Sequence, residues 1–282
     1  MNNNLLAKHA KSFYWASFFL SKNIYKKCCA LYNFCRTLDD IVDDDGSLEN
    51  KKKKFLEFKK DFSSKRFENL IIKEMWSIIV NEKIPEKIVY DLFDGVERDL
   101  NIKVEIKSKK DLLVYSYRVA GTVGLMMSRI LKVKDKASLK GAIDLGIAMQ
   151  LTNIARDVLE DKNRNRKYID FSFSAIKETV DTAETFYQKS FSAIKSIPLR
   201  SRFSVIVARR VYKKIGNYIL KQGNLENYSS AGKIYVPKTE KVIETILSIG
   251  DLFKLLFIKN INFSNEENHS IIKEEINLDE RI

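Results

Sequence analysis

Apolar residues recur at helical spacing through most of this chain, and this periodicity limits the fold more than any other feature. One run contains Leu31, Phe34 and Leu38, and a second contains Leu145 and Ala148. Residues three and four positions apart lie on one face of an α-helix, whereas strands alternate with a period of two. Only 10 glycines and 3 prolines interrupt the 282 residues, so turns are sparse. The sequence therefore predicts an all-α fold.

The loop over residues 223–237 is longer than most, but none of the loops between these patterns resembles a domain linker. We expect one helical domain over residues 1–259 and a polar C-terminal tail over 260–282 that frays. The most apolar late run, residues 243–258, is interrupted by Asp251 and Lys254, so it is too short and too charged to span a bilayer. No secretory signal is evident at the N-terminus. These features predict a cytoplasmic protein, and peripheral contact with the inner face of the membrane is compatible with them.

The chain is basic, with 50 Lys and Arg against 37 Asp and Glu and a formal net charge of +13. Such an excess suggests an anionic partner: nucleic acid, an acidic membrane surface or a phosphorylated substrate. A general bias towards Lys, Asn and Ile is the alternative explanation. No helix-turn-helix or aromatic-basic platform stands out, so nucleic acid is not expected. Three clustered cysteines, Cys28, Cys29 and Cys35, predict free thiols rather than disulfides.

Residues 31–44 place acidic side chains on one stripe of a predicted helix. At about 100° per residue the stripe holds Tyr32, Arg36, Asp39 and Asp43. Like charges at i and i+4 cost a helix about 0.2–0.5 kcal/mol even when exposed. Apolar residues cover the other directions, so we expect a helix packed nearly all round, where that cost rises unless a cation neutralises the pair. Mg²⁺ meets this need because it binds carboxylates together with substrate phosphates. A solvent-facing acidic helix end is the alternative.

A second predicted helix, over residues 146–161, repeats the arrangement. Its stripe holds Gln150, Asn153, Asp157 and Asp161. Two carboxylates and one amide oxygen are hard ligands suited to Mg²⁺. Arg156 points off the stripe, and the strongly basic loop 162–168 follows the helix and could close over a polyanion. Together the two acidic helices are suited to clamping a diphosphate through bridging metal ions.

A third helical pattern, over residues 115–127, contains Gly121 and Gly124. Each glycine inside a helix costs about 1 kcal/mol relative to alanine. Close packing between helices explains them, and so does a bend or a wall of small residues beside a long apolar ligand. Both explanations stay open.

Four segments, taken in order, resemble the squalene/phytoene synthase family. They are residues 9–14, 31–43, 119–124 and 150–161, and the likeness extends from about Lys8 to Pro237. Within the family the chain looks most similar to bacterial phytoene synthases. The resemblance implies an all-α isoprenoid synthase fold, which is a single helical bundle around a central cavity.

The resemblance also implies roles for individual residues. Mg²⁺, with Mn²⁺ as a substitute, would be held by Asp39, Asp43, Asn153, Asp157 and Asp161. The four aspartates and Tyr212 would be catalytic. The substrate would contact His9, Ser12, Phe13, Tyr32, Arg36, Gln150, Arg156, Arg166, Tyr168 and Lys233.

Two positions depart from the family pattern. The basic loop usually ends in Tyr-Leu-Pro, and here Tyr168 is followed by Ile169 and Asp170. Lys233 stands where the family often has an arginine, and lysine keeps the charge but loses the bidentate fork.

For activity, the resemblance implies head-to-head condensation of two geranylgeranyl diphosphates to phytoene in carotenoid biosynthesis. The reaction passes through prephytoene diphosphate, a cyclopropyl diphosphate, and NADPH is not expected. The nearest alternative is a squalene, dehydrosqualene or hydroxysqualene synthase that uses two farnesyl diphosphates. A non-catalytic assembly factor is a further alternative, but it should have lost its metal ligands, and both acidic stripes are intact here. The sequence does not indicate an oligomeric state.

Overall fold

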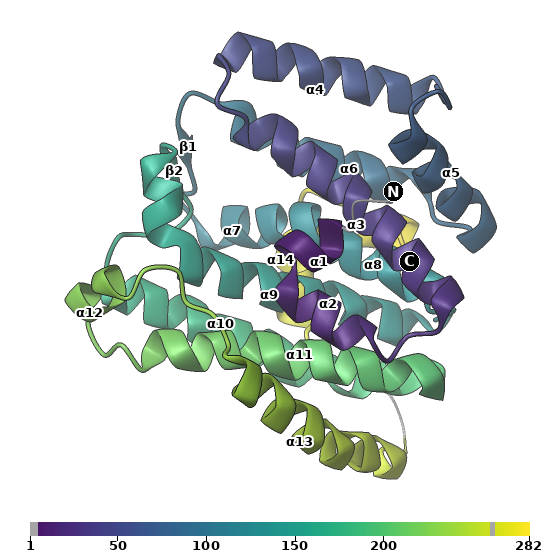
Figure 1. The fold of residues 1–282 in the computed structure, drawn as a ribbon, viewed down its shortest axis with the longest axis vertical. Helices are drawn as coiled ribbons and strands as arrows, with labels where there is room; N and C mark the ends of the chain where they lie inside the picture. The colour runs from purple at the N-terminus through teal and green to yellow at the C-terminus, as the bar shows by residue number, and fades with distance from the viewer. Residues whose placement is uncertain (1–4, 260–262) are drawn as a thin grey trace.

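The computed structural model describes residues 5–259 and 263–282, and helices make up nearly all of its regular structure (Figure 1). The predicted all-α class is confirmed. The α-helices are α1 (Leu5–His9), α2 (Lys11–Ser17), α3 (Lys22–Asp43), α4 (Leu48–Ser63), α5 (Leu70–Glu82), α6 (Glu86–Glu97), α7 (Lys109–Ser116), α8 (Thr122–Ile130), α9 (Lys136–Asn163), α10 (Phe173–Ser190), α11 (Leu199–Leu220), α12 (Leu225–Ser230), α13 (Lys238–Phe257) and α14 (Glu266–Lys273). The shorter elements are η1 (Arg98–Leu100), η2 (Tyr117–Gly121), η3 (Ser192–Ser196), η4 (Leu278–Glu280), β1 (Val104–Glu105) and β2 (Arg166–Lys167).

Helix α3, which carries the first acidic motif, leaves part of its acidic stripe uncovered by other helices. Its apolar side chains, including Leu31, Phe34 and Leu38, are buried, and the Phe34 ring lies 5.5 Å from the ring of Phe62 on α4. Asp39, by contrast, is exposed to solvent. The expectation of a helix packed nearly all round is therefore wrong, because α4, α5 and α6 cover the apolar face and leave the acidic face open.

The glycine pattern lies where two helices touch. A Cβ atom added to Gly124 of α8 would lie 2.2 Å from the carbonyl oxygen of Ala142, and one added to Gly146 of α9 would lie 2.3 Å from that of Ala120. Real side chains do not tolerate such distances, so close helix packing requires both glycines. Between α7 and α8 the backbone forms the π-helix η2, a widened turn that is common at functional sites.

Two short strands hold the basic loop in place. β1 and β2 pair in parallel, with Val104 opposite Arg166 and Glu105 opposite Lys167. The pair lies beside the ends of α3 and α9 (Figure 1). Because β2 follows α9 directly, the strand pairing fixes the direction in which the chain leaves the second acidic motif.

The C-terminal segment packs against the helical body. His269 of α14 is fully buried, and its Nε2 lies 2.8 Å from Oδ1 of Asp144 on α9. Arg281 makes two hydrogen bonds to the Asp91 carboxylate, at 2.9 and 3.0 Å. The expected fraying is therefore wrong for residues 263–282, while the division of the chain at residue 260 stays a prediction.

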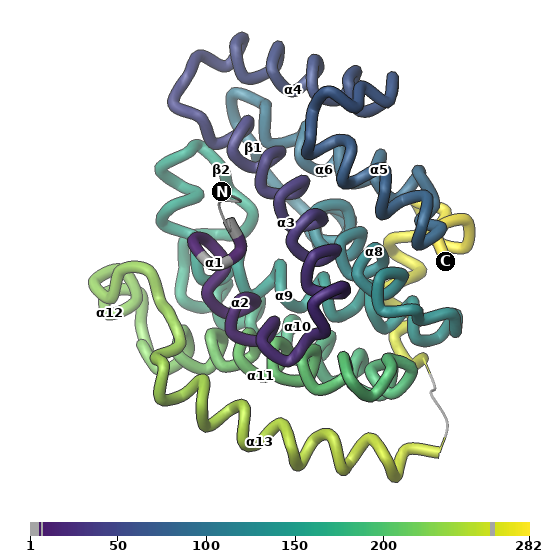
Figure 2. The backbone as a smooth tube through the Cα atoms, turned by 45° about the vertical axis from the view of Figure 1, so that its right-hand side comes forward, coloured from purple at the N-terminus to yellow at the C-terminus, as the bar shows by residue number. Residues whose placement is uncertain are grey.

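Helix α13 lies at the outer edge of the molecule in both views (Figures 1 and 2). It packs against α11 and also contacts η3. No helix among the described residues is both long enough and apolar enough to span a membrane.

Candidate active site

The first acidic motif is joined to the basic loop by ion pairs. Oδ2 of Asp43, at the end of α3, lies 2.7 Å from Nη1 of Arg164, and its Oδ1 lies 3.0 Å from Nη1 of Arg166. These contacts bridge more than a hundred residues of sequence. They place the loop after α9 against the acidic end of α3, as the diphosphate-clamp hypothesis requires.

Asp39 lies one turn before Asp43 on α3. Solvent reaches its side chain, yet protein surrounds it closely enough to perturb its ionisation. Desolvation, reinforced by the nearby Asp43 carboxylate, raises the pKa of Asp39 to about 7, although Arg36 opposes the shift. A cation bound beside Asp39 would reverse this shift, because it would stabilise the carboxylate form.

We call Asp39 and Asp43 on α3 one acidic wall and Asp157 and Asp161 on α9 the other. Asp161, like Asp39, has a raised pKa. Burial and then Asp157 raise the pKa of Asp161 to about 7, while Arg166 opposes the rise. The charge of Asp99 also contributes to the raised pKa of both Asp39 and Asp161. Asp99 therefore lies within electrostatic range of both aspartates, and Arg166 interacts with acidic residues of both helices, through its ion pair with Asp43 and its charge near Asp161.

Asp99 is a site residue that the sequence analysis missed. The hydroxyl of Tyr115 donates to its Oδ2 at 2.8 Å, and the hydroxyl of Tyr168 donates to its Oδ1 at 2.7 Å. The two tyrosine rings stack with their centroids 4.8 Å apart. Burial raises the pKa of Asp99, and Arg166 opposes the rise. Asp99 lies in the short η1 turn, so no helical stripe could have marked it.

Asp157 lies at a distortion in α9. Its backbone angles, φ −106° and ψ 15°, depart from helical values. Arg156 holds its carboxylate in a fork, with Nε to Oδ1 at 2.8 Å and Nη2 to Oδ2 at 2.6 Å. Lys233 adds a longer contact at 3.5 Å. The carboxylate predicted to bind metal is thus neutralised by two cations of the chain itself.

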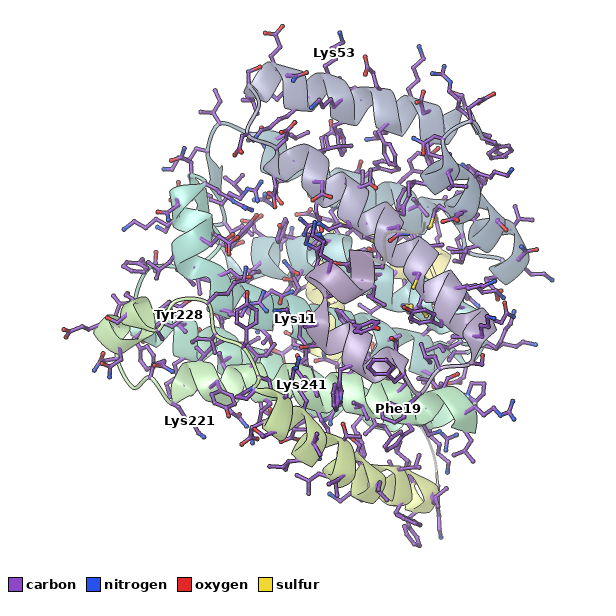
Figure 3. The ribbon with its side chains drawn as sticks, in the orientation of Figure 1. Lys11, Phe19, Lys53, Lys221, Tyr228 and Lys241 are labelled. Atoms are coloured by element: carbon purple, nitrogen blue, oxygen red, sulfur yellow. The ribbon has the colours of Figure 1, made fainter. Side chains whose placement is uncertain are left out.

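Tyr228 supports this distortion and was also missed from the sequence. Its hydroxyl donates to the carbonyl oxygens of Ala155 and Arg156, at 3.0 and 2.8 Å. Tyr228 belongs to α12 and is labelled in Figure 3. The contact satisfies carbonyls next to the irregular turn, so Tyr228 helps to fix the position of Asp157.

Asn153, one turn before Asp157 on α9, has a side-chain oxygen that is available as a metal ligand. Its Oδ1 is buried and has no hydrogen-bond partner among the described residues. A buried polar atom left unpaired costs about 1–3 kcal/mol, so such an atom calls for an explanation. Its Nδ2 contacts Oε1 of Gln150 at 3.5 Å. Burial raises the pKa of Tyr212, and side-chain hydrogen bonds with Asn153 and Arg156 oppose the rise.

Some of the remaining residues predicted to contact substrate have observed side-chain contacts, and others have none. Phe13 packs against Tyr212 with ring centroids 4.8 Å apart, and burial raises the pKa of Tyr32 to about 12, with Tyr212 among its neighbours. Arg36 pairs with Asp40 at 2.6 Å. His9 is exposed and Ser12 half-buried, and neither side chain makes a hydrogen bond within residues 5–259 and 263–282. Their predicted roles stay predictions.

The donors fit a metal that is held jointly with a substrate. In the described part of the chain, no three His, Cys, Asp or Glu side chains stand close enough together to hold a metal ion by themselves. The hard oxygen donors are divided between two walls, and Asn153 contributes an unpaired oxygen. Mg²⁺ commonly takes one or two carboxylates and completes its shell with water and phosphate oxygens.

The all-α fold and the acidic walls on α3 and α9 together indicate the family to which the protein belongs. The Squalene/phytoene synthase family model matches residues 6–169, more than half of the chain, and the protein belongs to this family of prenyltransferases.

Similar proteins whose names state an activity agree with this family assignment. The chain is 28% identical to a 15-cis-phytoene synthase of Pantoea ananas, over 77% of this chain and 83% of that protein. It is 30% identical to a 15-cis-phytoene synthase of Enterobacter agglomerans, over 76% and 83% of the two chains. Among solved structures, a dehydrosqualene synthase with bound ligand superposes with a TM-score of 0.71 at 25% identity, covering 89% of this chain and 94% of the other.

Proposed function

We propose that this protein is a phytoene synthase, which condenses two geranylgeranyl diphosphates head to head and releases two diphosphates. The first step would form prephytoene diphosphate with loss of one diphosphate and one proton. The second ionisation, with rearrangement and loss of another proton, would give phytoene. The observation that carries the proposal is the pair of intact acidic walls in a chain whose named relatives are 15-cis-phytoene synthases.

The chain's own cations would receive the leaving diphosphate. Arg156, Arg166 and Lys233 lie beside the acidic walls and are at present held by Asp157, Asp43 and Glu160. Positive charge placed where negative charge develops lowers the barrier to ionisation. The raised pKa of Tyr212 keeps its hydroxyl protonated near pH 7, so it can donate a hydrogen bond to a diphosphate oxygen.

Mg²⁺ would be bound by Asp39 and Asp43 on one wall and by Asn153, Asp157 and Asp161 on the other. When bound, it supplies Lewis-acid stabilisation of the leaving diphosphate. The unpaired Oδ1 of Asn153 and the raised pKa values of Asp39 and Asp161 support this assignment. Mn²⁺ should substitute, since it also prefers oxygen ligands.

A squalene-type activity with two farnesyl diphosphates is the second candidate. One observation favours it: the similarity to a dehydrosqualene synthase of known structure. The two activities differ in substrate length and not in the ionisation chemistry, so the acidic walls do not distinguish them.

A product assay separates the candidates. Purified protein is incubated with radiolabelled C15 or C20 diphosphate and Mg²⁺, with and without NADPH. A C40 hydrocarbon from the C20 substrate, formed without NADPH, is the expected result. A C30 product from the C15 substrate alone would assign the protein to the squalene branch, and no product from either would overturn the enzyme assignment. EDTA should abolish the reaction and Mg²⁺ should restore it. The same proposal includes a cytoplasmic location.

A further inference from the structure

Helix α13 presents its apolar side to solvent and its polar side to the protein. Eight of its large hydrophobic side chains are exposed: Val242, Ile243, Ile246, Leu247, Ile249, Phe253, Leu256 and Phe257. Its buried side chains include Lys241, Glu244, Ser248 and Asp251. A surface helix of a globular protein ordinarily has the opposite arrangement. Such a continuous apolar surface marks an interaction site.

The inverted arrangement is built into the contacts between α13 and α11. Arg210 of α11 donates to Glu244 at 2.8 Å and to Asp251 at 2.7 Å. Lys214 pairs with Glu240 at 3.0 Å. The acidic residues of α13 are therefore directed at α11, and rotating the helix to bury its apolar face would break these ion pairs.

The exposed face carries positive charge and no acidic side chain. Lys238 and Lys254 are its only charged residues that are exposed, and Lys254, 73% exposed, keeps a 3.3 Å contact with Asp251 from the side. A second copy of this chain would bring two lysine-bearing faces together without an acidic partner. The charge thus favours an anionic surface over self-association.

An unpaired lysine cluster adjoins the apolar face where α13 begins. Lys241 is only 8% exposed and has no acidic partner within the described residues. Lys11 and Lys238 lie close enough to lower its pKa further, after burial, the largest cause. Figure 3 shows Lys11 and Lys241 on neighbouring elements. Because a helix N-terminus also attracts anions, the cluster is suited to a phosphate group.

The apolar face and the lysine cluster point to one occupant. We propose that α13 lies in the surface of an anionic lipid bilayer, with its apolar side chains among the acyl chains and the lysine cluster on lipid phosphates. Interfacial helices bind in this way, through buried apolar area combined with attraction to anionic headgroups. The inference does not depend on the reaction proposed above.

Vesicle sedimentation with the full-length protein tests this. We expect binding to phosphatidylcholine vesicles containing about 30% phosphatidylglycerol, and much weaker binding to phosphatidylcholine alone. The double variant Phe253→Ser/Leu256→Ser should weaken binding at least about tenfold, since two large apolar side chains leave the interface. A matched control is Phe67→Ser/Leu56→Ser, which removes exposed side chains (48% and 56%) near α4 on the opposite edge and should bind as wild type.

The basic cluster is tested separately. Lys238→Gln/Lys241→Gln should weaken binding to anionic vesicles about fivefold per lysine, whereas Lys52→Gln/Lys53→Gln on α4 should change nothing. Inorganic phosphate at millimolar concentration should not displace the protein from vesicles. Displacement by phosphate would assign the cluster to a soluble anion instead of a lipid.

Three further results would overturn the proposal. They are equal binding by the α13 variants and their controls, no binding of wild type to anionic vesicles, and a dimer in light scattering that the apolar variant abolishes without any vesicle binding. Circular dichroism and turnover of detergent-dispersed substrate check that each variant is folded. A protein that lacks the proposed activity could still bind vesicles, so the two proposals fail independently.

Discussion

Acidic side chains occur in two regions of this molecule with opposite electrostatic surroundings. At the α11–α13 interface, Glu244 and Asp251 have side chains only 7% and 8% exposed, and Arg210 pairs with both, while Lys214 and Lys254 add further ion pairs. Burial alone would raise the pKa of Asp251, but hydrogen bonding and charge from Arg210 outweigh burial and lower it. In the candidate active site, Asp39 and Asp161 have no ion pair within the described residues, and their pKa values rise to about 7.

The difference separates a structural acid from a functional one. A carboxylate that is supplied with its own cation by the fold stabilises a helix interface. A carboxylate whose pKa is raised and that has no such cation can accept a cation from outside the chain, and such perturbed groups gather at functional sites. Asp43 and Asp157 are intermediate, because arginines of the basic loop and of α9 hold them.

The largest effect expected from this comparison is on catalysis. Asp39→Asn and Asp157→Asn should each lower turnover of the C20 diphosphate by at least about a thousandfold, because diphosphate ionisation loses its metal-based stabilisation. Asp39→Asn should not lower the free energy of unfolding, since no ion pair is lost. Asp181→Asn on the surface of α10 is the control and should keep full activity. Near-normal turnover in either site variant would defeat the metal assignment.

The second effect is on stability and concerns the structural acids. Arg210→Ala should lower the free energy of unfolding by about 3 kcal/mol, because Glu244 and Asp251 would remain buried without their main partner. Urea denaturation measures this change in the free energy of unfolding. The exposed ion pair of Lys177 and Asp181, 61% and 55% exposed, provides the comparison. Lys177→Ala should change stability by less than about 0.5 kcal/mol, and equal losses in both variants would refute the distinction.

The smallest effect is on the pH dependence of stability in metal-free buffer. Asp39 and Asp161 titrate near 3.8 when unfolded and near 7 when folded, so the folded state binds more protons between these values. Their contribution therefore makes stability fall as pH rises from about 4 to 7. The contribution of Asp251, whose pKa is lowered, is instead lost as pH falls through its folded-state pKa, below 3.8. The double variant Asp39→Asn/Asp161→Asn should flatten the profile between pH 4 and 7, and an unchanged slope would count against the unpaired state of these acids.

The sequence predicted those parts of the site that lie on single helices. Asp39 and Asp43, like Asp157 and Asp161, repeat at one helical turn, and such spacing is visible without a structure. Asp99 and Tyr228 were missed because their partners are distant in sequence: Asp99 meets Tyr115 and Tyr168 only after folding. No local pattern encodes an approach of this kind.

The periodicity of an amphipathic helix also does not reveal whether its apolar face is turned towards the protein or towards solvent. Residues 243–258 were noted for their apolar character, but a helical period does not say which side faces the protein. The partners Arg210 and Lys214 on α11 decide this for α13. In the C-terminal tail, Ile272, Ile276 and Leu278 are the apolar anchors that a largely polar composition concealed.

The glycine contact between η2 and α9 has a mechanical consequence. At Gly146, α9 rests on the Ala120 carbonyl with no room for a methyl group, so this point acts as a fulcrum. Asp157 lies about 16 Å from Gly146 along the axis of α9, at 1.5 Å per residue. A tilt of about 4° at the fulcrum would move its carboxylate by about 1 Å, a displacement that can cost about a hundredfold in rate. The close contact at Gly146 would therefore act as the pivot of a lever whose long arm ends at Asp157, the carboxylate predicted to bind metal.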